Sequence, residues 1–300
     1  MSEDIGIGIY ENISFEDYCK LDAVNNSSLK QMDISPAHCK ASLDGKETLD
    51  SDAMRFGRLI HCGQLEPEHL DSRYVVMPDY HLMPDNVTAE GKPSKAKTTK
   101  FYKECVEGFE KAENDIGREI VTSKVYGQME KALEVIKANP VADTLLNQEG
   151  RTELTIVWDC EFTGVRCKAR LDKHAEALGA IADLKTCANP QWFNWELWKY
   201  NYHKQAAFYR EGWRVATGEE VPFWLVIIGP RDQLDLLTCL AAPVSAELLD
   251  VGFTANLEAL GKVAYCQERD EWPNIEQPDE WTGPDHKVQA ALDREEVFNG

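Results

Sequence analysis

Three short runs of apolar and β-branched residues stand close together in the middle of the chain, at residues 152–158, 165–171 and 180–184. Their length and composition predict three β-strands. Thr163 and Gly164 form a turn signal between the first two runs, which predicts a hairpin. The first two strands are therefore expected to lie side by side.

Apolar residues at helical spacing flank these strands on both sides. The predicted helices cover residues 52–65, 98–114, 123–138, 191–216 and 244–266, and further strands are predicted at 73–77, 223–228 and 234–240. This order is typical of an α/β fold with a central mixed β-sheet flanked by helices. We expect one domain over residues 1–270, with a helical N-terminal part, followed by an acidic C-terminal tail at 271–300.

The composition fits one sizeable core. The chain has 300 residues, of which 43% are hydrophobic, and no apolar run reaches the roughly 18 residues of a membrane span. Its acidic N-terminus lacks the basic and apolar regions of a secretory signal, so we expect a cytoplasmic protein. The nine cysteines form no CxxC pair, which argues against a zinc ribbon or a disulfide framework and favours reduced, buried thiols.

The formal net charge of −20 argues against a DNA-binding protein, because an acidic surface repels the phosphate backbone. The objection is limited, because a nuclease that encloses a DNA end needs only a local basic lining and concentrates carboxylates at its metal site. The same charge would also suit a DNA mimic or a protein-binding module. Charge alone therefore leaves these alternatives open.

Acidic and basic side chains gather at the second and third central strands. Asp172 is expected to end the second strand, while Asp183 and Lys185 lie two residues apart on the third and so share one face. If these strands are neighbours, two carboxylates and an ammonium group converge. Carboxylates with open positions suit Mg²⁺, and a lysine beside the metal can orient a water for attack on a phosphodiester. Asp-x-Lys alone is a common pattern, so further matches are needed.

Three other side chains could belong to the same site. His61 lies late in the helix predicted at 52–65. Gln205 and Tyr209 are four residues apart on the helix after the third strand, so they share a face and could contact a DNA phosphate or brace the lysine. Each signal is weak on its own. Glu153 opens the first central strand, and we interpret it as a solvated strand end rather than a residue behind the metal ligands.

An ordered set of residues resembles the motif series of the RecB/lambda-exonuclease branch of PD-(D/E)xK nucleases. These residues are Gly57, His61, Asp172, Asp183, Leu184, Lys185, Gln205 and Tyr209. The segments at 27–38, 163–173 and 202–209 look most like RecE-type exonucleases, the nuclease domain of exodeoxyribonuclease VIII. The superfamily has Glu more often than Asp at the position of Asp183, and RecE-like members share the Asp.

This resemblance implies a restriction-endonuclease-like core and a role for each motif residue. The implied metal ligands are His61, Asp172, Asp183 and the Leu184 carbonyl, with Mg²⁺ bound and Mn²⁺ able to substitute. The implied catalytic residues are Lys185, which positions the attacking water, together with Asp172, Asp183, Gln205 and Tyr209. The implied activity is digestion of linear double-stranded DNA from its ends, 5′ to 3′, leaving a 3′ strand for recombination. Members of this kind form ring-shaped homo-oligomers, trimers or tetramers, and work with a RecT-type single-strand annealing protein.

Residues that contact DNA are less clearly marked. Ser28, Lys30 and Ser35 stand at predicted helix starts, where free NH groups could hold a 5′-phosphate or where the serines could simply cap the helices. Arg170 and Lys168 lie on the second central strand and could touch DNA. We include Ser28, Lys30, Ser35 and Arg170 as candidate DNA-binding residues.

Two more segments could contact nucleic acid. Trp192, Phe193, Trp195 and Trp198 could stack on bases, but aromatics at helical spacing more often belong to a core or a subunit interface. The lysine-rich segment at 83–100 could guide DNA, although a mobile, solvated loop is its ordinary interpretation.

Two other functions stay open. One is an enzyme of the same fold that acts as a single-strand or structure-specific endonuclease. The other is a catalytically silent acidic protein, such as a DNA mimic. The intact set of Asp172, Asp183 and Lys185 argues against the silent protein, because a binding module has no need to keep these residue types together.

Overall fold

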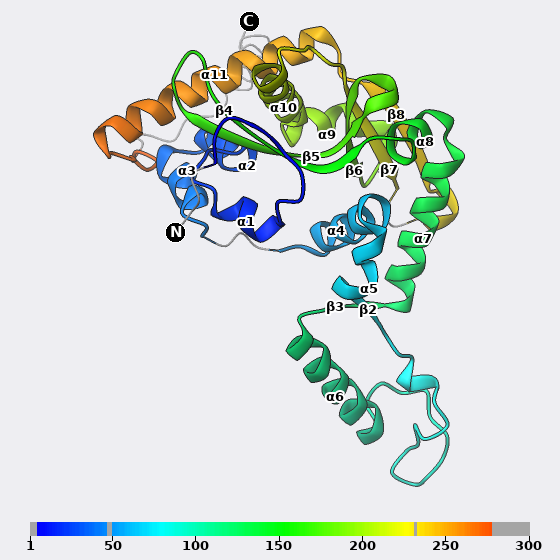
Figure 1. The fold of residues 1–300 in the computed structure, drawn as a ribbon. Coiled ribbons are helices and arrows are strands. Elements are labelled where there is room, and N and C mark those ends of the chain that lie inside the picture. Colours follow the sequence, from blue (N-terminus) through cyan, green and yellow to red (C-terminus); the bar gives the residue numbers. More distant parts are fainter. Residues whose placement is uncertain (1–4, 47–49, 231–232, 278–300) are drawn as a thin grey trace, which may run out of the picture.

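The computed structural model describes residues 5–46, 50–230 and 233–277, and it is built around a six-stranded β-sheet (Figure 1). In spatial order the strands are β1 (Gly8–Tyr10), β4 (Arg151–Asp159), β5 (Arg166–Ala175), β6 (Ala180–Thr186), β7 (Phe223–Gly229) and β8 (Thr238–Pro243). β6 and β7 are parallel, and the other neighbouring pairs are antiparallel. The predicted α/β fold with a central mixed sheet is confirmed.

Helices cover both faces of this sheet, and each face has its own hydrophobic core. The first core includes residues of α2 (Asn26–Leu29), α3 (Pro36–Leu43), α9 (Phe193–Lys199), α10 (Tyr202–Thr217) and α11 (Ala246–Arg269). The second core includes residues of α4 (Asp52–Leu65), α7 (Ser123–Ala138) and α8 (Pro140–Asn147). A short helix, α1 (Phe15–Lys20), precedes α2 near the edge of the sheet.

Strand β7 illustrates how a central strand serves both cores. Leu225 and Ile227 belong to the first core, while Val226 and Ile228 belong to the second. A strand that is buried on both faces has no polar alternation, so its sequence is a continuous apolar run. This explains why residues 223–228 are recognisable as a strand from the sequence alone.

Trp158 fills the space between β4 and α10. Its side chain is buried, its ring centroid lies 4.8 Å from that of Phe208, and a Cβ atom on Gly212 would come within 2.7 Å of the indole. We expect Trp158→Ala to lower the free energy of unfolding by about 3–5 kcal/mol, because the cavity cannot close fully. Urea denaturation would measure this loss. The exposed Trp195→Ala is the matched control, with an expected change below about 0.5 kcal/mol; an equally small change for Trp158→Ala would contradict the prediction.

Most elements lie within a few residues of their predicted bounds, and three of the differences affect the architecture or the site. Strand β5 continues to Ala175, so Asp172 lies within the strand and not at its end. The helix predicted at 191–216 is two helices, α9 and α10, because Asn201 has a φ of 58° and breaks the helical path. The strand predicted at 234–240 begins only at Thr238, after a 3₁₀ turn. In each case the deviation depends on packing or backbone conformation that hydropathy does not record.

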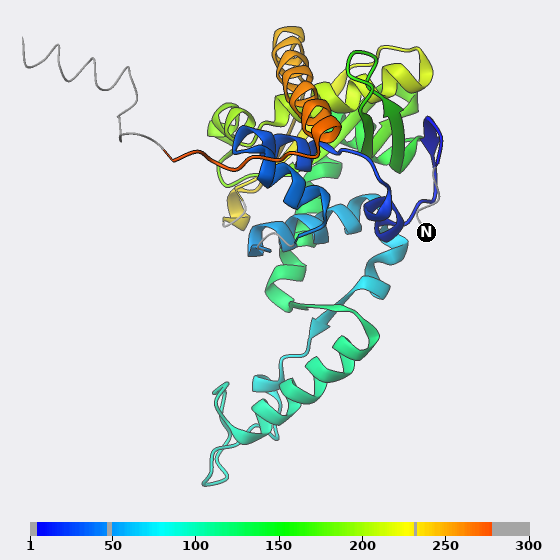
Figure 2. The same ribbon diagram turned by 90° about the vertical axis from the view of Figure 1, so that its left-hand side faces the viewer.

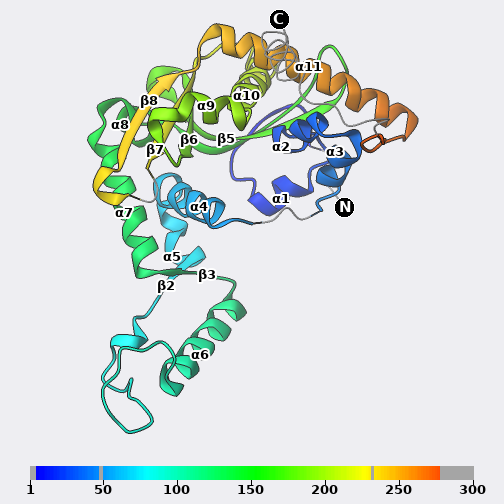
Figure 3. The same ribbon diagram turned by 180° about the vertical axis from the view of Figure 1, so that it is seen from behind.

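An arm projects from the body of the protein (Figures 1 and 3). It consists of α5 (Leu70–Arg73), the parallel strands β2 (Tyr74–Met77) and β3 (Glu119–Thr122), and α6 (Lys100–Ile116). The lysine-rich segment lies in this arm. The buried Asn86 amide holds it by donating hydrogen bonds to the carbonyl oxygens of His81, Ser94 and Ala96. The segment therefore has an internal scaffold, while Lys92, Lys95, Lys97 and Lys100 are exposed.

The chain after α11 returns to the N-terminal helices (Figure 2). The Ala37 N–H donates to the Pro273 carbonyl at 3.0 Å, the Ser35 hydroxyl donates to Asn274 Oδ1 at 3.3 Å, and Trp272 packs against the first core. The start of the predicted acidic tail is therefore docked, and residues 278–300 of that tail lie outside the described residues. Within the described residues, none of the helices combines the length and apolar character needed to cross a membrane.

Candidate active site

The strands β5 and β6 separate partway along their length, and the candidate site lies at this fork. They pair only from Lys173 to Ala175 against Ala180 to Ala182. Beyond this point the Asp172 carboxylate takes the place of the missing strand partner, because its Oδ2 accepts the Leu184 N–H at 2.7 Å. Asp172 and the backbone of Leu184 are thus held together at the opening.

His61 reaches the same point from the neighbouring helix α4. Its Nε2 lies 2.7 Å from the Leu184 carbonyl oxygen, and its Nδ1 lies 3.5 Å from Asp172 Oδ2. Gly57, one turn earlier, faces the end of β6, where a Cβ atom would lie 3.8 Å from Thr186 Oγ1. The helix therefore brings the imidazole onto the fork, as the sequence motif requires.

Asp183 and Lys185 form a buried pair on β6. The Asp183 side chain is 1% exposed, and its Oδ2 contacts the Lys185 ammonium group. Burial raises the pKa of Asp183 to about 6, although Lys185 acts in the opposite direction. Burial alone would lower the pKa of Lys185, but the charges of Asp183 and Asp172 outweigh it and raise that pKa. The lysine therefore stays charged at neutral pH.

Two residues of α10 complete this wall of the site. Gln205 donates an Nε2–H to Asp183 Oδ1 at 3.0 Å, which fixes the orientation of the carboxylate. Burial raises the pKa of Tyr209 well above its usual range, while a hydrogen bond with Gln205 acts in the opposite direction. The two side chains share one face of α10, as their spacing predicts. The structure thus brings together all the motif residues from α4, β5, β6 and α10.

Glu153 lies at the fork beside His61 and Asp172. The interpretation of Glu153 as a solvated strand end is wrong, because its side chain is only 19% exposed and pairs with Arg170. The hairpin register pairs Leu154 with Leu171 and Thr152 with Lys173, which places Glu153 opposite Asp172. Glu153 has a φ of 53°, a strained conformation for a non-glycine residue.

A divalent cation fits these groups. His61, Glu153 and Asp172 each offer a ligand atom, and these three atoms lie within 4.8 Å of one another. Asp183 Oδ2 is buried, and apart from its ion pair with Lys185 it has no hydrogen-bond partner among the described residues. Such a carboxylate-rich set suits Mg²⁺, and its single imidazole suits Mn²⁺ as well. With the Leu184 carbonyl, these residues would hold the ion.

Glu153 gives a direct test of this donor set. We expect Glu153→Gln to raise the Mn²⁺ concentration needed for half-maximal cleavage about 10- to 100-fold, because a neutral amide binds metal more weakly and no longer pairs with Arg170. Metal titration of the cleavage rate would measure this shift. Glu176→Gln, which changes the exposed partner of Arg151, is the matched control. An unchanged metal requirement in Glu153→Gln would place this carboxylate outside the metal site.

The candidate DNA-binding residues fare differently from one another. Ser35 is buried and capped over by Asn274, and Arg170 is mostly buried between Glu153 and the Ile13 carbonyl, so neither is available to DNA in this structure. Ser28 is also buried and is not a helix cap. Its hydroxyl lies 3.0 Å from that of Ser42, and the cap of α2 is Asn25. Packing against other segments of the chain makes Ser28, Ser35 and Arg170 inaccessible to DNA.

Two lysines from the same segments have opposite surroundings. Lys168 is buried, and its ammonium group donates to the carbonyl oxygens of Tyr18, Cys19 and Leu21, so it is a structural residue. Lys30 is half-buried near the site, and burial together with the charge of Lys185 lowers its pKa. Lys30 is therefore a candidate DNA-binding residue near the fork, where the other nearby candidate, Arg170, is held by Glu153.

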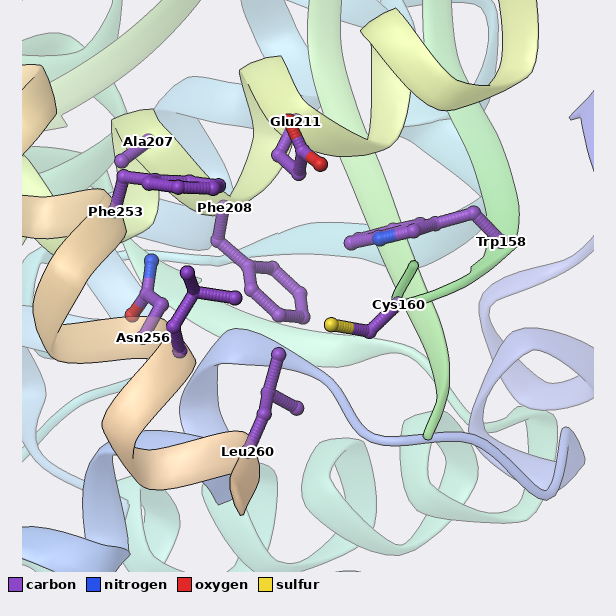
Figure 4. A pocket seen from close by; sticks show the side chains of 9 residues that line it. Trp158, Cys160, Ala207, Phe208, Glu211, Phe253, Asn256 and Leu260 are labelled. Carbon is purple, nitrogen blue, oxygen red and sulfur yellow. The ribbon is translucent and has the colours of Figure 1, made fainter. Parts of the chain in front are cut away.

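A small cavity lies on the other side of α10, away from the fork (Figure 4). Its lining is mainly apolar and includes Trp158, Cys160, Phe208 and Leu260. Its volume of about 10 Å³ leaves room for a single water molecule. Although Glu211 and Asn256 also line this cavity, it is too small for a substrate, so the fork between β5 and β6 is the stronger candidate for the active site.

Comparisons with solved structures concern the fold of the chain. Among solved structures, a candidate exonuclease from Eubacterium rectale aligns over 92% of this chain and 96% of that chain, with a TM-score of 0.55 and 16% identity. At this identity the likeness concerns the fold alone. The protein SSO0001 aligns over 68% of this chain and 84% of its own, with 15% identity and a TM-score of 0.27, which is too low to support an argument. No curated protein matches the chain.

A family model covers nearly the whole described structure. It is named as a PDDEXK-like domain of unknown function (DUF3799), and it matches residues 25–278. The matched range contains α4, β4, β5, β6 and α10, which carry every residue of the fork. The predicted membership of the PD-(D/E)xK superfamily is confirmed. The chain belongs to the DUF3799 family of PDDEXK-like domains.

Proposed function

We propose that this protein is a divalent-metal-dependent nuclease that hydrolyses phosphodiester bonds in DNA. The observation that carries the proposal is the convergence of His61, Asp172 and Asp183 with Lys185 at the fork between β5 and β6. A structural ion pair would not need an imidazole and a second carboxylate beside it. The PDDEXK-like family supports the same reading.

The residues of the fork divide the chemistry among them. A bound Mg²⁺ or Mn²⁺ would neutralise charge on the scissile phosphate and favour ionisation of an attacking water. Lys185 would donate a hydrogen bond that orients this water, because its ammonium group is held at the fork by Asp183. Gln205 would keep the Asp183 carboxylate in position. Tyr209 would support Gln205 from the same face of α10.

The substrate that we propose is the end of a linear DNA duplex, digested 5′ to 3′ to leave a 3′ strand for recombination. The resemblance of the motif segments to RecE-type exonucleases supports this specificity. A ring-shaped trimer or tetramer would reconcile DNA binding with a net charge of −20, because a basic lining can face inward while the acidic surface faces out. A RecT-type annealing protein would then be the partner. Residues 1–270, with the arm as an insertion, would act as one nuclease domain.

Digestion of two forms of one DNA tests the proposal. A linear duplex labelled at one 5′ end and the same DNA as a closed circle are incubated with the protein and Mg²⁺ or Mn²⁺. Shortening of the linear DNA from its ends, with the circle intact, is the expected result. Nicking of the circle would instead indicate an endonuclease. If neither Mg²⁺ nor Mn²⁺ supports cleavage, the proposal is overturned and an acidic binding protein is favoured.

A further inference from the structure

An aromatic surface lies on α9 and the turn before it. Trp192, Trp195 and Trp198 are 56%, 72% and 52% exposed, while Phe193 and Leu197 are buried in the first core. Helical spacing places these three indoles on the face opposite the buried pair. Phe193 therefore belongs to the core, as one of the two ordinary interpretations of this cluster has it, while the three tryptophans lie on the surface of the chain. We define the aromatic surface as Trp192, Trp195, Trp198 and the exposed Tyr200.

This surface is continuous with the candidate active site. The Lys185 ammonium group lies 5.3 Å from the centroid of the Tyr202 ring. That ring stacks on Phe193 at 5.9 Å and lies 5.8 Å from the ring of Tyr200. Tyr202 thus connects the lysine at the fork to Tyr200, the member of the aromatic surface that directly follows α9.

The charge along this part of the chain differs from that of the whole. Between Leu184 and Tyr209 the basic residues are Lys185, Lys199 and Lys204, and the acidic one is Glu196. Lys185 is paired with Asp183 and Lys204 with Asp33, so Lys199 is the lysine that belongs to the aromatic surface. The Lys199 ammonium group lies 5.1 Å from the centroid of the Tyr200 ring. In a chain with a net charge of −20, a lysine at this surface suits a polyanion better than it suits a second copy of the same acidic protein.

We propose that the aromatic surface stacks against unpaired bases of the DNA strand whose phosphate enters the fork. This inference rests on the proposed function and narrows its substrate. Bases within a duplex hide their faces in the helical stack, so exposed rings can reach them only where the strand is unpaired. The site would therefore act on a strand that is already unpaired, or frayed over its last nucleotides, next to Lys185.

Binding to single strands with and without bases tests the proposal. Labelled oligonucleotides of one length, either normal or built entirely from abasic residues, are titrated with the full-length protein in EDTA, where metal-dependent cleavage cannot occur. The wild type should bind the normal strand more tightly than the abasic one. The double variant Trp192→Ala/Trp195→Ala should bind the normal strand roughly 10- to 100-fold more weakly and leave abasic binding unchanged.

Two variants serve as controls. Trp192→Phe/Trp195→Phe keeps flat rings and should retain most of the affinity for the normal strand. Phe162→Ala removes an exposed aromatic ring that packs on Phe253 of α11 instead, and it should change nothing. Equal binding of the normal and abasic strands by the wild type, or unchanged binding by the double alanine variant, would overturn the proposal.

Two further measurements separate this inference from the proposed function. If the double alanine variant changes the native mass of the protein and not its affinity for single strands, the aromatic surface is an interface between copies, and the inference fails. Metal-dependent cleavage by the wild type is assayed on its own. If the wild type cleaves DNA but the double alanine variant binds single strands as well as the wild type does, only the inference is contradicted. If the wild type binds strands in a base-dependent way but does not cleave DNA, only the proposed function is contradicted.

Discussion

Asp183→Ala is expected to reduce the rate of metal-dependent DNA cleavage by more than about 100-fold. Even changes to groups that lie behind a metal ligand cost about 10- to 100-fold, and Asp183 itself faces the fork. Its loss removes one carboxylate from the donor set and leaves the Lys185 ammonium group without its buried partner. Gln205 also loses the acceptor at 3.0 Å that it now holds. The steady-state rate on a linear duplex is the measurement.

The same variant has a readout that does not depend on activity. Metal that binds only the folded protein raises its melting temperature, and the shift grows as the affinity increases. We expect millimolar Mn²⁺ to raise the melting temperature of the wild type and to have much less effect on Asp183→Ala. Asp159→Ala, which removes a carboxylate paired with Arg166 at the other end of the sheet, is the matched control. A wild-type-like Mn²⁺ shift in Asp183→Ala would show that the carboxylate is not a ligand.

Lys185→Ala is expected to lower the cleavage rate by about 10²- to 10⁴-fold while metal binding persists. A side chain that positions or polarises the attacking water typically contributes this much to the rate. An ammonium group does not bind a cation, so its removal leaves the donor set intact. We therefore expect Lys185→Ala to lose cleavage activity but to retain the Mn²⁺-dependent shift in melting temperature.

The outcome for Lys185 separates two roles. Lys131→Ala, an exposed lysine paired with Glu134 on α7, is the control for loss of a positive charge and should keep full activity. If Lys185→Ala loses the Mn²⁺ shift as well, the lysine acts mainly by holding Asp183 in place. Full activity in Lys185→Ala would remove the lysine from the chemistry altogether.

Much of the fold and of the candidate site could be predicted from local sequence. Strand β7 is a continuous apolar run because it is buried on both faces, and the hairpin of β4 and β5 is marked by its turn at Thr163 and Gly164. Asp183 and Lys185 share a side of β6, and Gln205 and Tyr209 share a side of α10, because backbone periodicity alone decides this. Properties that depend only on residues close together in the sequence can therefore be predicted from it.

Other features of the site depend on residues that are distant in sequence. The strands β5 and β6 separate after three pairs, so Asp172 binds the Leu184 backbone from within a strand and not from its end. Glu153 joins the site because the strand pairing places it opposite Asp172 in a strained conformation. The hydrophobic periodicity of the strands predicts neither the position of Asp172 nor that of Glu153, because both positions depend on how the strands diverge in space.

Burial is the second property that only the tertiary structure decided. Ser35 is covered by Asn274, which lies 239 residues away, and Arg170 turns inward to Glu153, so neither candidate is free for DNA. The tryptophans of α9 point outward because Phe193 and Leu197 already fill the face toward the core. A sequence records which side chains could bind a phosphate or stack on a base. Which of them are exposed depends on how segments far apart in the chain compete for the same space.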